Sequence, residues 1–325
     1  MANPQITTTP VSTAFSTTNT STATTGATNW STQSFTGPSV SSTNAESVDM
    51  NTANIVQSNL TRKVPYSSYS TNFEGADNRY NVGTTSLGIT SAITVSAWVK
   101  IPTTNTGGAA PNIQEIICED TTGGSNRNWA LNWRGGGYNV FSFAVFHTDG
   151  TVSSISTTGI TPNNGLWQNV VGTFDGTTLK IYVNGQQAQT PVTAVSTGVR
   201  SASAVEPAIG SVTNSNSWNF EGHISNCAVW NTGITDDDAI NLYNNGITQD
   251  LNNFRVTPYA WWPLDENSTY FNGSVLVARD TIGAKDGTGI NLVQSDIEGN
   301  APGSEANGTG TNLSISSLKG NMNNS

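Results

Sequence analysis

Two acidic residues, Glu115 and Glu119, are the first candidates for chemistry in this sequence. They stand four positions apart in an apolar run. Retaining glycoside hydrolysis uses two carboxyl groups about 5–5.5 Å apart, one as nucleophile and one as an acid of raised pKa. The residue halfway between them is Ile117, which cannot help to separate the two pKa values. We therefore predict that both are polar residues near the end of a strand, without a catalytic role.

Other catalytic groups lack partners. The sequence has no Gly-x-Ser-x-Gly turn for a serine nucleophile, and its two histidines, His147 and His223, stand beside a turn and a glycine with no recognisable partner. Two cysteines, Cys118 and Cys227, are too few for a disulfide framework or a four-thiolate zinc site, and we expect them to be buried free thiols. The sequence therefore predicts a protein that is not an enzyme.

Sugar binding is the chemistry that remains. Indole faces stack on pyranose rings, and Asn or Asp side chains supply the hydrogen bonds. Three of the nine tryptophans lie within predicted strands and are expected in the core: Trp98, Trp167 and Trp230. Three others lie near turns and, with one asparagine, form the candidate glycan-binding residues on an exposed rim: Trp129, Asn132, Trp133 and Trp218.

Composition limits the function classes. The chain has 325 residues, with 22 acidic and 12 basic residues and a formal charge of −10, so it lacks the cationic surface that nucleic acid requires. No run of eighteen apolar residues is present, so we expect no insertion into a membrane. No Lys or Arg precedes Arg62, and we expect no secretory signal. The 32 glycines and the abundant Ser, Thr and Asn predict an all-β protein with tight turns.

The elements that must position these residues are strands joined by short turns. In Ile93–Lys100 apolar residues alternate with others, as in a strand. Asp-Gly or Asn-Gly turns, which are strong hairpin signals, follow at residues 149–150, 175–176 and 184–185. One short helix is predicted, with Thr235 as its N-cap, Asp238 completing a capping box and Gly246 at its end.

The order of several short motifs resembles a known family. They are Tyr69-Ser-Thr-Asn-Phe73-Glu-Gly75, Val95-Ser-Ala-Trp98-Val-Lys100, Trp167-Gln-Asn-Val-Val-Gly-Thr-Phe174-Asp-Gly176, Leu179-Lys-Ile-Tyr-Val-Asn-Gly185, Phe220-Glu-Gly222-His-Ile224 and Thr235 to Gly246. Together they resemble a laminin G-like domain of the concanavalin A-like lectin/glucanase superfamily. The resemblance implies a two-sheet jelly-roll sandwich that binds glycans or proteins, often with calcium. Glucanases of the superfamily carry Glu-x-Asp-x-Glu, and Ile117 replaces the central Asp here.

A calcium site is an open possibility under this resemblance. Family members often place an Asp after the Ile of the Gly-x-Ile strand, where this chain has Ser225-Asn226, so the most expected carboxylate ligand is missing. The remaining candidate ligands are Glu119, Asp120, Asp265 and Asp280. The metal therefore stays unknown, and no other cofactor is expected.

The sequence predicts three regions. Residues 1–66 form a Ser/Thr/Asn-rich arm that is expected to order only on a partner surface. Residues 67–265 form the sandwich, with Thr257–Asp265 returning as its closing strand and with Trp261 and Trp262 facing opposite ways. Residues 266–325 form a C-terminal extension.

A repeat flanks the predicted sandwich. Asn54-Ile-Val-Gln-Ser58-Asn-Leu60 reaches Pro65 at the spacing by which Asn291-Leu-Val-Gln-Ser295-Asp-Ile297 reaches Pro302. Each copy has a short apolar strip, and we expect both to dock on neighbouring subunits as added strands or clamps. The predicted docking residues are Asn54, Ile55, Leu60, Pro65, Asn291, Leu292, Ile297 and Pro302.

This repeat beside such a domain is similar to virion proteins inferred from marine bacteriophages. The sequence therefore predicts a non-enzymatic protein of the virion exterior, a capsid decoration or fibre component that displays its sandwich and holds host-surface glycans. Its expected partners are like chains in a homo-oligomer and other virion proteins. A free carbohydrate-binding module or adhesin is the alternative, and a polysaccharide hydrolase or lyase is the third possibility.

Overall fold

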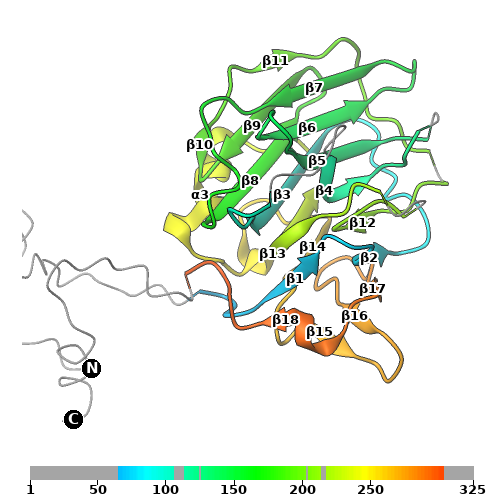
Figure 1. Ribbon diagram of the computed structural model, residues 1–325. Helices are drawn as coiled ribbons and strands as arrows, with labels where there is room; N and C mark the ends of the chain where they lie inside the picture. The colour runs from blue at the N-terminus through cyan, green and yellow to red at the C-terminus, as the bar shows by residue number, and fades with distance from the viewer. Residues whose placement is uncertain (1–64, 106–112, 124–125, 203, 214–216, 304–325) are drawn as a thin grey trace, which may run out of the picture. The chain divides into compact units, whose positions relative to one another are not determined.

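Two antiparallel β-sheets face one another in the computed structural model, which describes residues 65–105, 113–123, 126–202, 204–213 and 217–303 (Figure 1). Sheet A has the order β10 (Gln186–Gln187), β9 (Thr178–Val183), β8 (Trp167–Phe174), β3 (Ile93–Lys100), β13 (Glu221–Trp230), β1 (Ser70–Glu74) and β18 (Ile297–Glu298); β11 (Val192–Thr193) also pairs with β9 and β14 (Ala260–Trp262) with β13. Sheet B has the order β15 (Thr269–Phe271), β16 (Leu276–Ala278), β17 (Gly287–Ile290), β2 (Arg79–Val82), β12 (Ala208–Ile209), β4 (Ile113–Glu119), β5 (Trp129–Arg134), β6 (Val140–Phe146) and β7 (Val152–Ser156).

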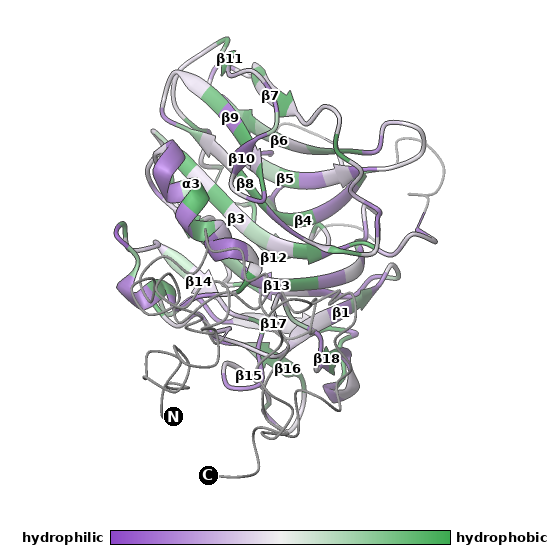
Figure 2. Cartoon of the chain, turned by 90° about the vertical axis from the view of Figure 1, so that its left-hand side faces the viewer, coloured by the Kyte–Doolittle hydropathy of each residue, from purple (hydrophilic) through white to green (hydrophobic). Residues whose placement is uncertain are grey.

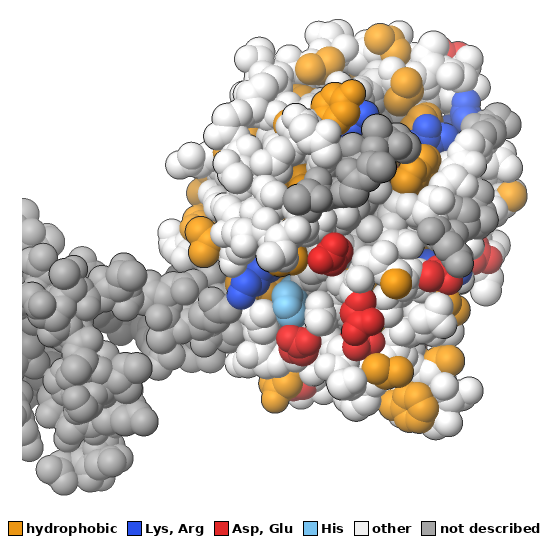
Figure 3. Space-filling view, viewed as in Figure 1, with side chains coloured by type: hydrophobic (Ala, Val, Ile, Leu, Met, Phe, Trp, Pro, Cys, Tyr) orange, Lys and Arg blue, Asp and Glu red, His pale blue; other side chains and the backbone are white. Residues whose placement is uncertain are grey.

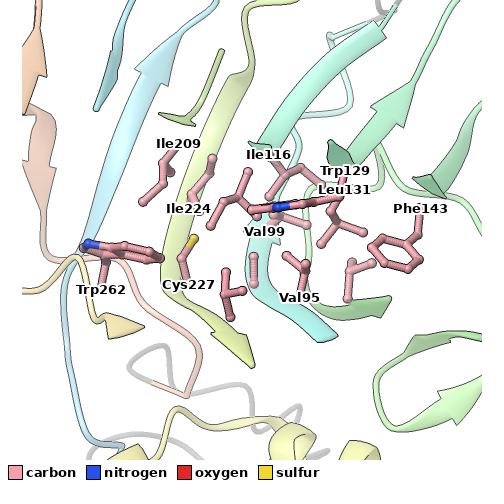
Figure 4. Packing of buried hydrophobic residues seen from close by; sticks show 14 of the residues in the cluster. Val95, Val99, Ile116, Trp129, Leu131, Phe143, Ile209, Ile224, Cys227 and Trp262 are labelled. Carbon is pink, nitrogen blue, oxygen red and sulfur yellow. The ribbon is translucent and has the colours of Figure 1, made fainter. Parts of the chain in front are cut away.

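The core lies between the sheets because alternate residues of each strand point inward. Val95 and Val99 of sheet A point toward Leu131 and Phe143 of sheet B, and all four are fully buried (Figure 4). The sheets approach closely at Gly172 of β8, where a Cβ atom would overlap the ring of Phe143. The predicted all-β, two-sheet sandwich is confirmed.

A second apolar cluster covers the outer face of sheet A. It contains Trp230 and Trp261 together with Ala239 and Leu242 of the helix α3 (Asp236–Tyr243). Figure 2 shows α3 lying against the strands of sheet A. This helix therefore covers one end of the outer face of sheet A, and no described helix covers the other end.

The helix begins as the sequence predicts. Thr235 is its N-cap, and both hydrogen bonds of the capping box to Asp238 are present. The α-helix ends at Tyr243, followed by Asn244 in the left-handed conformation, and Gly246 closes the 3₁₀ turn η2 (Asn244–Gly246). None of the helices in the described ranges is long and apolar enough to cross a membrane.

The chain after Tyr259 completes both sheets. In β14, Trp262 pairs with Cys227 of β13 and enters the inter-sheet core, whereas Trp261 enters the outer cluster. We predicted that the sandwich ends at residue 265, but β15, β16 and β17 extend sheet B and β18 extends sheet A. Residues 266–298 therefore belong to the two sheets.

The second copy of the repeat, Asn291–Pro302, lies on its own sandwich. Leu292 is buried in the core, the 3₁₀ turn η4 (Gln294–Asp296) follows, and Ile297 pairs with Thr71 at the edge of sheet A. Pro302 is also buried. We predicted contacts with a neighbouring subunit, whereas this apolar strip is already covered by its own chain. Of the first copy, Asn54, Ile55 and Leu60 lie outside the described residues.

Candidate functional site

The tryptophans predicted for an exposed rim are mostly in the core. Trp129 and Trp133 are fully buried between the sheets, so this part of the prediction is wrong. They lie on β5, which pairs with β4 on one side and with β6 on the other. Side chains alternate along a strand, so Trp129 and Trp133 point inward while Asn132 points outward. Trp167 was predicted for the core, but it is half-buried on the outer face of sheet A.

Asn132 and Trp218 lie on the outer side of sheet B. Asn132 is 7% exposed, and its Nδ2 donates to Glu115 Oε1 at 3.4 Å. Trp218 packs on the small cluster around Cys118, with the Arg127 guanidinium 5.4 Å from the centre of its ring. The four predicted glycan-binding residues therefore do not converge on one surface.

Glu115 and Glu119 point to opposite faces of sheet B. A regular strand would place residues four apart on one face, but the register shifts between Glu115 and Ile117. Glu115 pairs with Asn132 on the outer face, whereas Glu119 pairs with the inward-facing Trp129. The two carboxylates therefore cannot act on one glycosidic bond, which agrees with the predicted lack of a catalytic role.

Both carboxylates are buried, with different surroundings. Glu119 accepts hydrogen bonds from the Leu87 backbone and from the Asn128 and Ser86 side chains, and desolvation still raises its pKa. Glu115 has an Oε2 atom with no hydrogen-bond partner, and burial, with the charge of Asp120 adding to it, raises its pKa well above the usual range.

A polar hollow opens on the part of sheet A that α3 leaves uncovered. Four side chains form a row across four adjacent strands, because Asn72 pairs with His223, His223 with Lys100, and Lys100 with Trp167. The hollow has a volume of about 450 Å³, and Asn72, Lys100 and His223 line it. Figure 3 shows acidic side chains gathered near a histidine and a basic side chain on this surface.

The C-terminal segment after β18 crosses one end of this row. Asn300 Oδ1 accepts hydrogen bonds from Lys100 Nζ at 3.3 Å and from Trp167 Nε1 at 3.2 Å. Asn300 also lines the hollow. Two donors thus converge on one oxygen acceptor beside a half-buried indole ring, which is an arrangement suited to a sugar hydroxyl.

A serine, a histidine and a carboxylate also meet beside the hollow. Ser70 Oγ lies 3.3 Å from His223 Nδ1, and His223 Nε2 lies 3.8 Å from Glu298 Oε2, while Asn72 Nδ2 donates to Glu298 Oε1. Ser70 is fully buried and its hydroxyl donates to the Asn300 carbonyl. Because its only proton goes to that carbonyl, His223 donates to Ser70 and does not act as a base that activates it.

The rim of the hollow carries two facing acids. Glu74 of β1 and Glu221 of β13 are direct cross-strand partners, and both line the hollow. Side chains directly opposite on one face have Cβ atoms about 4.5–5.5 Å apart, and like charges there repel. No hydrogen bond or ion pair from the described residues reaches either carboxylate.

Two of the acids considered for calcium, Asp120 and Asp280, are engaged by other groups. Asp120 holds Arg127 through two hydrogen bonds, of 2.5 and 2.7 Å. Asp280 accepts four backbone N–H groups, from Trp261, Ile282, Gly283 and Lys285. Within the described part of the chain, no group of three or more His, Cys, Asp or Glu side chains is placed to hold a metal ion.

Cross-strand register, which is not encoded locally, assembles the hollow. Its lining residues come from three strands (β1, β3 and β13), from the loops at residues 102–103 and 165 and from the C-terminal segment, over a span of more than two hundred residues. The one local signal was the polar outward residue at the end of β3, Lys100, which follows a run of buried residues. We predicted Trp167 for the core and found no recognisable partner for His223, so neither residue was predicted to belong to a site.

A two-sheet sandwich with a polar hollow on one outer face defines a lectin-like β-sandwich protein. A sequence model of the concanavalin A-like lectin/glucanases superfamily matches residues 74–241. The match covers more than half of the chain, and the chain belongs to this superfamily. A comparison with curated protein sequences found no match.

Several solved structures are similar to this chain. A candidate carbohydrate-binding protein from Bacteroides ovatus is similar at 18% identity with a TM-score of 0.54, covering 74% of this chain and 62% of that protein. A heptameric pentraxin from Limulus polyphemus (15% identity, TM-score 0.41, 54% and 81% of the two chains) and domains LG4-5 of the mouse laminin α1 chain (13%, 0.39, 54% and 44%) are also similar. At 18% identity, the likeness to the Bacteroides ovatus protein concerns the fold alone.

Proposed function

We propose that the protein binds glycans through the polar hollow of sheet A and performs no chemistry on them. The observation that carries this proposal is the cross-strand row that ends in Trp167, with Lys100 and Trp167 both donating to one acceptor beside the hollow. A volume of about 450 Å³ falls within the range of about 300–1,000 Å³ usual for small-ligand sites.

The chemistry of the lining suits a sugar. Beside the lining, Trp167 lies with its ring centroid 6.1 Å from that of His223 and offers an indole ring on which a pyranose can stack, while the amide, imidazole and ammonium groups of the lining supply donors and acceptors for hydroxyls. The absence of catalysis rests on the opposite orientations of Glu115 and Glu119 and on the burial of Ser70.

The context that we propose is the exterior of a virion. In this setting the sandwich is displayed, and residues 1–66 hold it to like chains and to other virion proteins. The supporting observations are the arm composition and the similarity of its repeat to a segment that docks on a sheet edge in this chain. Mass spectrometry of purified particles tests this context, and particles that lack the chain would contradict it.

Glycan binding is tested by replacing Trp167 with Ala in the full chain and probing a panel of immobilised oligosaccharides. We expect the wild type to bind a subset of the panel and Trp167→Ala to lose at least about tenfold in affinity, the equivalent of about 1.4 kcal/mol. Tyr138→Ala removes an exposed aromatic ring from the turn between β5 and β6 and should bind like the wild type. The proposal is contradicted if the wild type binds no glycan of the panel, or if Trp167→Ala and Tyr138→Ala bind equally well.

Trp167→Phe separates stacking from hydrogen bonding. Phe retains a ring but cannot donate to Asn300 Oδ1. An intermediate affinity is expected, and circular dichroism with thermal unfolding shows whether each variant is folded. Release of sugar from any bound polysaccharide would instead establish an enzyme.

A further inference from the structure

We propose that the hollow selects saccharides that carry a protonated amine. This inference rests on the proposed function and names its ligand class. Its basis is the facing pair Glu74 and Glu221, which places two carboxylates at the rim of a site suited to sugar hydroxyls.

The two acids form a like-charge pair that has no ion-pair partner among the described residues. They occupy facing positions on adjacent strands, where two anions repel. Neither carboxylate takes part in an ion pair or hydrogen bond with a described residue. A cation bound between them would turn this repulsion into two attractive contacts.

The basic residue nearest to the two acids in the strand register is Lys100, and its amine donates to another residue. Lys100 pairs with His223, so it is diagonal to Glu221 across the strand pair, and its Nζ donates to Asn300. The carboxylate of Glu298 is held by Asn72 and lies near His223. Lys100 and His223 therefore lie in the row that ends at Trp167, whereas Glu74 and Glu221 form a second pair two residues farther along β1 and β13.

This division fits one ligand with two parts. A sugar ring can stack at Trp167 and direct a hydroxyl oxygen toward Lys100, while an amine on the same or the next ring reaches the carboxylates. A free ammonium group makes charge-assisted hydrogen bonds to carboxylates. An N-acetylated sugar has no charge at that position, and its acetyl group would face two anions without neutralising them.

The net charge of the chain also favours a positively charged ligand. Its formal charge is −10, and Glu74 is exposed to solvent. Attraction at an exposed site is weakened by salt, because the Debye length falls to about 3 Å at 1 M ionic strength. The preference for an amine-bearing ligand should therefore shrink as sodium chloride is raised.

The test compares two probes of equal length on the full chain by calorimetry: the tetramer of β-1,4-linked glucosamine and the tetramer of N-acetylglucosamine, at pH 6 and low salt. We expect the glucosamine tetramer to bind at least about tenfold tighter. In Glu74→Gln/Glu221→Gln this preference should fall to about twofold or less. Glu206→Gln/Glu266→Gln makes the same change in net charge away from the hollow and should keep the preference.

Each outcome decides the inference. Equal or weaker binding of the glucosamine tetramer overturns the amine selectivity, and so does a preference that survives in Glu74→Gln/Glu221→Gln. If the wild type binds neutral glycans of the panel in these cases, the proposed function stands without the selectivity. If it binds neither tetramer and no glycan of the panel, both proposals fail.

Discussion

Replacing Glu115 with Gln should stabilise the protein above neutral pH. Glu115 is fully buried, and its Oε2 atom has no partner, while the facing Asn132 has an unpartnered Oδ1. A Gln at this position keeps an acceptor for Asn132 Nδ2 and adds an amide donor for Asn132 Oδ1. The chain already has such a reciprocal pair in Asn105 and Gln114, whose two hydrogen bonds are 3.1 and 3.2 Å long.

The size of the effect follows from the unsatisfied atom. A buried polar group without a partner costs about 1–3 kcal/mol, so Glu115→Gln should raise the free energy of unfolding at pH 8 by about this amount. A gain of 1 kcal/mol corresponds to a rise in Tm of about 2–4 °C for a domain of this size.

The gain should depend on pH. Burial, supported by the charge of Asp120, raises the pKa of Glu115 well above its usual value of 4.5. In a folded protein with a raised carboxyl pKa, stability is highest at low pH and is lost as pH rises above the unfolded pKa. The difference between Glu115→Gln and the wild type should therefore be small near pH 4 and should grow up to pH 8.

Urea unfolding at several pH values checks this reasoning. The variant Asn132→Ala, alone and with Glu115→Gln, completes a double-mutant cycle, and the gain from Glu115→Gln should be smaller by about 0.5–1.5 kcal/mol when residue 132 is Ala. A Glu115→Gln variant that is less stable than the wild type at pH 8 would refute the argument. That result would mean that Glu115 is ionised in the folded protein and is stabilised by the neighbouring Arg127.

Three further substitutions test the fold. Gly172→Ala places a methyl group against the Phe143 ring between the sheets and should destabilise the protein by about 1–3 kcal/mol in urea unfolding; an unchanged midpoint would show that the sheets can separate locally. Thr235→Ala removes the N-cap contact to the Asp238 backbone and should cost about 0.5–2 kcal/mol, with Thr235→Ser close to wild type. Asp280→Ala leaves four backbone N–H groups without an acceptor and should lower Tm clearly, whereas a Tm equal to that of wild type would show that water replaces the carboxylate.

Local signals in the sequence were sufficient for the turns and the helix. Asn184 and Gly185 both adopt positive φ in the two-residue turn between β9 and β10, because Asn and Gly tolerate the left-handed conformation. Thr235 and Asp238 form the predicted capping box through contacts only three residues apart. Each of these features is decided within a few residues, so its cause can be read directly from the chain.

The faces of the strands needed the tertiary structure. Alternation indicates which residues share a face, but it does not indicate which face is covered. Trp129 and Trp167 both lie in alternating strands, yet the first faces the inter-sheet core and the second lies on the outer face of sheet A beside the hollow. The register shift after Glu115 reverses the expected facing of the acids, and no residue type marks its position.

The hollow itself depends on pairing between distant strands. Asn72 meets His223 across 151 positions of sequence, and Glu298 returns to this pair from near the C-terminal end of the sandwich. Pairing of this kind is set by the packing of two whole sheets around one core, because a strand that slips by one residue moves its entire apolar face into solvent. The sequence by itself therefore determined the class of fold and its hairpins, and the packing of the sheets decided which side chains meet at the site.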